Sequence, residues 1–179
     1  MEKRIFNLSF IYITILLSIP NLIFGQSDPK KVSDEELTKV AKEIIDQANN
    51  CALISLDVEG NPRVRIMDPF KPEKDFIIWF GTNPKSRKVI QIKSDSRVTL
   101  YYVAEDNSGY VTILGEAQII DDSAEKEKRW KEKWKAFYPN YPEGYALIKV
   151  TPKSMEVISI THNILGDTKS WQPPAIEFD

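Results

Sequence analysis

The sequence predicts a mainly β fold, a small antiparallel barrel with helices packed on its outside. Three observations lead to this fold class. About seven short apolar or alternating segments are separated by turn residues and follow one another as hairpins, as in small all-β domains. Helical patterns occur mainly near the start and toward the end of the chain, so helices do not alternate regularly with the strands. Gly115 interrupts the longest strand pattern, which is typical of a bulge or of the bend of a barrel.

The N-terminus is typical of a secretory signal peptide. Lys3 and Arg4 precede an apolar run from Leu8 to Leu17, and cleavage is expected after Gly25. The run is short for a membrane span of about 20 residues, and an uncleaved anchor is the alternative. We therefore expect an exported protein, periplasmic or extracellular, with no stable membrane span. The expected organisation is a signal peptide at 1–25, a linker at 26–32, a barrel domain at 33–160 and a C-terminal tail at 161–179.

Charge and cysteine content exclude several classes of protein. The net charge is −2, and removing the leader, which carries +1, leaves −3. A nucleic-acid-binding domain usually has a basic surplus, so no nucleic-acid partner is expected. The single cysteine, Cys51, excludes an intrachain disulfide, and we expect it to be a small buried apolar residue.

The domain is expected to begin with a helix and a hairpin. Ser33 and Glu36 form a capping box, and apolar residues then recur at helical spacing over residues 34–49. Strands at residues 51–58 and 63–67 flank a Glu-Gly-Asn-Pro turn.

The next strand and helix carry the most informative stretch. An apolar strand at residues 75–80 leads to Asn83 and Pro84, a good N-cap and first residue for a helix over residues 84–93. Lys85, Ser86, Arg87 and Lys88 then fall in the first turn, where the helix dipole disfavours cations. The pattern is either a solvated helix face or an anion site at the helix start.

The remaining elements are expected at residues 97–103, 110–120, 145–150 and 154–159 as strands, and at 123–137 as a charged helix. Trp130, Trp134 and Phe137 form a stripe along that helix, which we expect to pack on the barrel. Its lysines are expected to face solvent.

Few residues offer direct chemistry. With one His and one Cys, a zinc site or a Cys–His nucleophile pair is not expected, and His162 has the placing of an ordinary surface residue. Arg63 and Arg65 leave the same face of one strand with Met67. They form either a solvated outer face or one wall of an anion site. With Trp79 and Phe80 as apolar surface for a flat ring, the second reading describes a phosphorylated planar cofactor.

Three motifs together resemble the pyridoxamine 5′-phosphate oxidase-like split-barrel flavoproteins, and within them the general stress protein 26-type branch. The motifs are Arg63–Met67 (R-V-R-I-M), Trp79–Val89 (W-F-G-T-N-P-K-S-R-K-V) and Gly109–Ala117 (G-Y-V-T-I-L-G-E-A). The likeness spans roughly residues 34–160.

The resemblance implies a homodimer that binds FMN between two split barrels. It assigns the flavin ring and ribityl chain to one strand, the ring edge to the next strand and the phosphate to the helix start. The residues concerned are Arg65, Ile66 and Met67, then Phe80, Gly81 and Thr82, then Ser86, Arg87 and Lys88. Tyr110 or Trp171 of the second subunit would cover the ring.

The chain departs from this family in two ways. Ile66 stands where Pro is frequent, and the Arg/His substrate motif of true pyridoxamine phosphate oxidases is missing. Vitamin B6 oxidation is therefore not expected. We expect an FMN-dependent oxidoreductase acting on an unknown small substrate. The alternatives are a flavin carrier or sensor, a haem-binding split barrel with His162 as its imidazole, and an apo structural dimer.

Overall fold

The structure is a computed structural model that describes residues 32–179. The expected signal peptide and all but the last residue of the expected linker lie outside the described residues, so they remain predictions.

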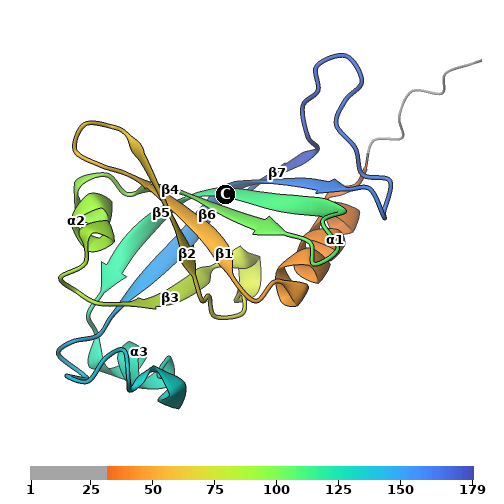
Figure 1. Cartoon of the computed structure of the whole chain (residues 1–179). Coiled ribbons are helices and arrows are strands. Elements are labelled where there is room, and N and C mark those ends of the chain that lie inside the picture. Colours follow the sequence, from red (N-terminus) through yellow and green to blue (C-terminus); the bar gives the residue numbers. More distant parts are fainter. Residues whose placement is uncertain (1–31) are drawn as a thin grey trace, which may run out of the picture. The chain divides into compact units, whose positions relative to one another are not determined.

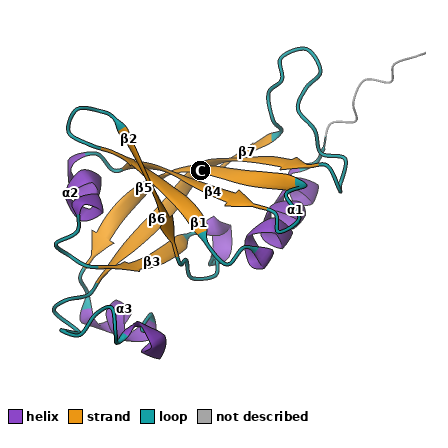
Figure 2. Ribbon diagram, viewed as in Figure 1, coloured by secondary structure: helices purple, strands orange, loops and turns teal. Residues whose placement is uncertain are grey.

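Seven strands and three α-helices make up the described part of the chain (Figures 1 and 2). This confirms the mainly β class with peripheral helices. In chain order they are α1 (Asp34–Gln47), β1 (Cys51–Leu56), β2 (Pro62–Met67), β3 (Ile78–Thr82), α2 (Arg87–Ser94), β4 (Arg97–Val103), β5 (Gly109–Ile120), α3 (Ser123–Lys128), β6 (Ala146–Ser159) and β7 (Ala175–Glu177).

All strands belong to one antiparallel sheet in the order β2-β1-β4-β5-β6-β3, with β7 also on β6. The order places β2 and β3 at opposite edges. The sheet curls so that the loop after β2 reaches β3, where Pro69 forms an isolated bridge with Phe80 and the Phe70 N–H donates to the Trp79 carbonyl at 2.8 Å. The barrel is thus joined at one point and otherwise open between its two edges.

β5 and β6 are the two longest strands and pair at the centre of the sheet. β6 is one continuous strand where two were predicted, because β5 pairs with it from Leu147 to Ser159 across a single register shift. The register shifts between Leu114 and Gly115, which confirms the predicted bulge. A Cβ at Gly115 would lie 2.5 Å from the carbonyl oxygen of Thr151, so this close strand approach requires glycine.

Helix α1 forms where an amphipathic helix was predicted, and its apolar side joins the core of the sheet. The Ser33 side chain accepts a hydrogen bond from the Glu36 N–H, and the helix buries an apolar stripe that includes Leu37 and Ile44. Cys51 is 2% exposed in the same core, and burial raises the pKa of its thiol to about 12. The prediction that Cys51 is a small buried residue is confirmed.

The predicted strand at residues 75–80 and the predicted helix at residues 123–137 are both wrong in extent. β3 begins at Ile78 rather than at residue 75, because Asp75 and Phe76 adopt positive φ angles of 58° and 56°. The helix predicted for residues 123–137 ends at Lys128 and is followed only by a short 3₁₀ turn, Glu132–Trp134.

Tertiary contacts explain why the helix after β5 stops early. The Arg129 guanidinium pairs with Glu73 and lies 3.7 Å from the ring centroid of Trp79, which draws the chain toward the sheet. Trp134 is buried among other aromatic rings as predicted, but Phe137 is 74% exposed and does not share that packing. Local helix propensity is a weak preference that such contacts override.

Candidate functional site

Helix α2 begins three residues later than predicted. Asn83 is not its N-cap, because its side-chain oxygen accepts from the Lys85 N–H at 2.8 Å within a turn that ends when the Ser86 N–H donates to the Asn83 carbonyl. Ser86 is the N-cap, and Arg87 and Lys88 open the helix. Lys85 lies in the turn, outside the first helical turn.

The start of α2 faces the end of β2 across a basic hollow of about 260 Å³. Each element contributes three residues, and these are Arg65, Ile66, Met67, Ser86, Arg87 and Lys88. The structure therefore brings together six of the residues that the sequence predicted for a cofactor, from two segments about twenty positions apart.

Hydroxyl groups hold the lysine at this hollow. The Lys88 Nζ donates to Thr82 Oγ1 at 3.2 Å, and Thr82 Oγ1 lies 3.2 Å from Ser86 Oγ. The Ser86 side chain makes no capping bond to the helix. Thr82 is 1% exposed, so its contribution is to position the two side chains above it.

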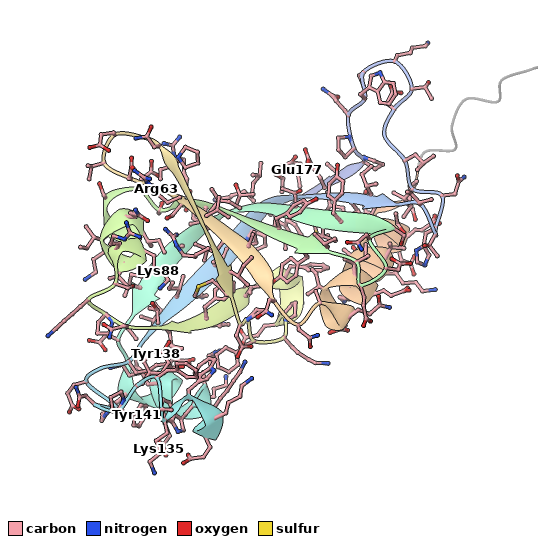
Figure 3. The ribbon with its side chains drawn as sticks, in the orientation of Figure 1. Arg63, Lys88, Lys135, Tyr138, Tyr141 and Glu177 are labelled. Carbon is pink, nitrogen blue, oxygen red and sulfur yellow. The ribbon has the colours of Figure 1, made fainter. Side chains whose placement is uncertain are left out.

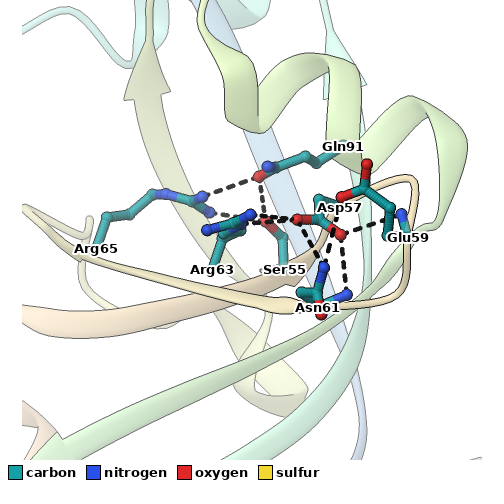
Figure 4. A network of polar contacts seen from close by, with 7 residues as sticks. All are labelled: Ser55, Asp57, Glu59, Asn61, Arg63, Arg65 and Gln91. Carbon is teal, nitrogen blue, oxygen red and sulfur yellow. Dashed lines mark hydrogen bonds and ion pairs between the residues drawn. The ribbon is translucent and has the colours of Figure 1, made fainter.

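Neutral acceptors hold Arg65. Its guanidinium donates to Ser55 Oγ at 2.7 Å and to Gln91 Oε1 at 2.8 Å, and the Ser55 hydroxyl in turn donates to the same Gln91 oxygen at 2.8 Å (Figure 4). Ser55 and Gln91 are buried, so they fix the arginine without neutralising it. Neither was predicted, although an inward-facing serine in the apolar strand Cys51–Leu56 was a usable signal.

Arg63 behaves differently from its neighbour. It leaves the same face of β2, as predicted, but its guanidinium pairs with Asp57 at 2.7 Å and it does not line the hollow (Figure 4). Of the two arginines, only Arg65 remains available to a ligand there.

The electrostatics of the hollow favour an anion. Desolvation and then the charge of Arg65 hold the pKa of Lys88 below its ordinary value of 10.5. Desolvation and the charge of Arg87 likewise lower the pKa of Arg65. Within residues 32–179, no carboxylate forms an ion pair with Arg65, Arg87 or Lys88. Three cations thus share one corner and lack a counter-charge.

A second hollow of about 330 Å³ continues from the first. The two share Ile66, Met67 and Lys88, so they form one groove with a basic end and a mainly apolar end, called the apolar end below. Figure 3 shows Lys88 on one side of β3 and Tyr138 on the other. The apolar end adds Asp68, Gly81, Trp134, Phe137 and Tyr138.

The other predicted residues are dispersed. Gly81 lines the apolar end, but the Phe80 ring is fully buried in the barrel core and offers a ligand no side-chain contact. Tyr110 lies on the outer face of the sheet, with its ring centroid 5.4 Å from that of Tyr101. Trp171 is 82% exposed in the loop before β7. Neither Tyr110 nor Trp171 lines the groove within a single chain.

Two features of residues 32–179 concern membrane and metal binding. No helix in this range has the length and apolar character needed to cross a membrane. No cluster of three or more His, Cys, Asp or Glu side chains in the same range could bind a metal ion.

Comparisons with known proteins place the chain among relatives of this fold. The family model described as Pyridoxamine 5'-phosphate oxidase like matches residues 35–167. General stress protein 26 from Bacillus anthracis str. Sterne aligns over 79% of this chain and 98% of its own, with 23% identity and a TM-score of 0.62.

Two other solved structures have the same fold. A protein related to general stress protein 26 from Clostridium acetobutylicum aligns over 83% of this chain and 98% of its own, with 18% identity and a TM-score of 0.66. An F420 reductase aligns over 64% of this chain and 94% of its own, with 19% identity and a TM-score of 0.52. No curated protein matches the chain.

Proposed function

The chain belongs to the pyridoxamine 5′-phosphate oxidase-like family, and we propose that it binds FMN in the groove between β2 and α2. The observation that carries this proposal is the uncompensated group of Arg65, Arg87 and Lys88 at one end of a groove whose other end is apolar. A phosphate would supply the missing charge, and charge-assisted hydrogen bonds to phosphate are strong.

Each end of the groove has a definite task in this proposal. Ser86, Arg87 and Lys88 bind the phosphate at the start of α2, where free backbone N–H groups and the helix dipole also favour an anion. Arg65 approaches the same group from β2. Ile66, Met67 and Gly81 border the ring and exclude water from it. FMN, when bound, supplies a ring that accepts and returns electrons.

We further propose that the protein is an oxidoreductase acting on a small substrate. In flavin chemistry the cofactor does the redox work, and the protein supplies position and solvent exclusion. A flavin carrier or sensor is the alternative. Reduction of bound FMN by a nicotinamide donor, followed by reoxidation with an acceptor, separates turnover from storage.

The arrangement around His162 gives the haem alternative no support. Its Nδ1 lies 2.9 Å from Ser159 Oγ and its Nε2 lies 3.4 Å from a Glu43 carboxylate oxygen. Both ring nitrogens therefore have protein partners, and neither hollow of the groove is lined by this residue.

Direct binding tests the FMN proposal. Protein expressed from the full-length chain should bind FMN with absorbance near ~450 nm, and should bind riboflavin at least about tenfold more weakly because riboflavin lacks the phosphate. Titration followed by absorbance or calorimetry measures both affinities. Equal affinities would contradict the phosphate site, and a protein that takes up neither flavin would contradict the proposal as a whole.

We also propose that the protein forms a homodimer through the outer face of β2, β1, β4 and β5. Register pairs Ile66, Ala52 and Tyr101 in one row across this face, and a parallel row ends at Leu114. Val64 is 64% exposed and Ile66 is 69% exposed on it. Such a continuous exposed apolar face usually marks an interface. Ile66 also lines the groove, so a second copy on this face would reach the ligand and could cover it with Tyr110 or Trp171.

A charge placed in this face should separate the copies. We expect the full-length protein to sediment as a dimer and Leu114→Lys to sediment as a monomer, because an unpaired ammonium would be buried at the contact. Ile90→Lys is the matched control, since Ile90 is 61% exposed on α2, outside this face. A monomeric wild-type protein, or dissociation caused equally by both variants, would refute the interface.

A further inference from the structure

Phe137 is the one aromatic residue of the segment after α3 that is not packed against its neighbours. In this segment Trp130, Trp134, Tyr138 and Tyr141 form ring contacts with one another or with Tyr145, at centroid distances from 4.2 to 6.3 Å. Phe137 has no such contact among the described residues and is 74% exposed. It nevertheless lines the apolar end of the groove.

Asp68 ties this segment to the strand that forms the opposite wall. Its carboxylate lies 2.8 Å from Lys131 Nζ and 3.2 Å from Lys133 Nζ, and it accepts from Trp134 Nε1 at 3.2 Å. Asp68 directly follows Met67, the last residue of β2. Desolvation would raise the pKa of this carboxyl, but the bonds and charges of the two lysines outweigh it and the pKa lies below 3.8. The anchor is therefore charged at neutral pH.

The segment is also held at its start, directly after α3. The buried Arg129 pairs with Glu73 at 2.5 Å, its guanidinium covers the Trp79 ring, and its carbonyl accepts from the Tyr145 hydroxyl at 2.7 Å. Phe137 follows both anchors in the chain, and its N–H donates to the carbonyl of the anchored Trp134 at 2.8 Å. The backbone position of Phe137 beside the groove is therefore set by the folded protein.

The two walls suit a flat ring. Met67 and Ile66 border the apolar end on the β2 side, and Trp134, Phe137 and Tyr138 border it on the other. A thioether and an aliphatic side chain facing a phenyl ring offer contact to both faces of a conjugated ring. Such a slot selects for a ring, whereas the basic end selects only for an anion.

We propose that Phe137 contacts the ring of the bound flavin and makes the groove selective for flavins over other phosphorylated ligands. This rests on the proposed FMN site. Trp134 and Asp68 act through Phe137: the first supports its backbone, and the second positions the segment beside β2. The ring is thus covered on one side by its own chain, independently of any residue that a second copy adds.

The test is Phe137→Ala in the full-length chain. Because the side chain is largely exposed, the melting temperature of the variant should equal that of the wild type. Loss of ring contact should weaken FMN and riboflavin alike by about tenfold. Binding of inorganic phosphate, which needs only the basic end, should not change. The flavin affinities of Phe137→Leu should lie between those of the wild type and those of Phe137→Ala, since leucine keeps apolar contact but not ring stacking.

Ile90→Ala is the matched control, because Ile90 is an exposed apolar residue that lines neither hollow. It should leave both flavin affinities unchanged. If the wild type prefers FMN to riboflavin and Phe137→Ala binds both as the wild type does, the FMN site stands and the role of Phe137 is refuted. If Phe137→Ala also loses phosphate affinity or melts early, its effect is structural and the role is again refuted. If the wild type binds neither flavin, the FMN site itself fails and the role of Phe137 fails with it.

Discussion

Replacing both Arg65 and Lys88 by methionine is expected to lower the affinity for FMN by at least about 100-fold. Each charged hydrogen bond to a phosphate contributes about 1.5–3 kcal/mol, and about 1.4 kcal/mol corresponds to a factor of ten in affinity. The fold should survive. Desolvation already lowers the pKa values of both side chains, as does the charge of Arg87 at Arg65 and that of Arg65 at Lys88. Ser55 and Gln91 remain hydrogen-bonded to each other when Arg65 is removed.

Arg63→Met provides the comparison for this experiment. Arg63 lies on the same strand and the same face as Arg65 but is already paired with Asp57, so its loss should change FMN affinity less than about threefold. Isothermal titration with FMN, together with a thermal melt of each variant, measures both effects. If Arg63→Met lowered the affinity as much as the double replacement of Arg65 and Lys88, general surface charge, and not the specific basic end of the groove, would be what attracts the ligand.

Gly81→Val is expected to reduce the free energy of unfolding by about 2–3 kcal/mol, the upper part of the range for overpacking a close contact. A Cβ at Gly81 would lie 2.7 Å from the Tyr145 ring and closer still to the Trp134 ring. Both rings are buried and held by other aromatic side chains, so they cannot move aside without loss. A domain of this size should melt roughly 5–10 °C lower.

A double-mutant cycle shows whether the collision is the cause. Trp134→Ala removes the nearer ring, so Gly81→Val should cost less in that background than in the wild type. Urea unfolding followed by circular dichroism gives the four free energies. If the cost of Gly81→Val is the same in both backgrounds, the close approach of strand and ring is not what requires glycine at this position.

Strand positions and the first helix could be predicted because short-range patterns determine them. The capping box at Ser33 and the apolar stripe that begins at Leu37 act within a few residues, and α1 follows them. The interruption at Gly115 likewise marks its bulge. Residues 123–137 have an equally regular pattern, yet Arg129 contacts Glu73 and Trp79, more than forty positions earlier in the chain. No local pattern contains that information.

The basic end of the site was predictable from an electrostatic conflict. Cations at a helix start indicate an anion, and the structure places Arg65 opposite Lys88 as that reasoning expects. Arg63 could not be separated from Arg65 by sequence, because the difference depends on whether Asp57 turns back toward the strand. The wall that contains Phe137 was missed because it depends on the early end of α3.

The short strand β7 has a consequence for solubility. β3 pairs with one edge of β6 only from Ala146 to Val150. β7 pairs with β6 farther along the strand, from Ser154 to Glu156. Without β7, those backbone groups would be free to add a strand from another molecule, which is the usual first step of sheet aggregation. By pairing with this part of β6, β7 thus blocks strand addition and protects the protein from polymerisation.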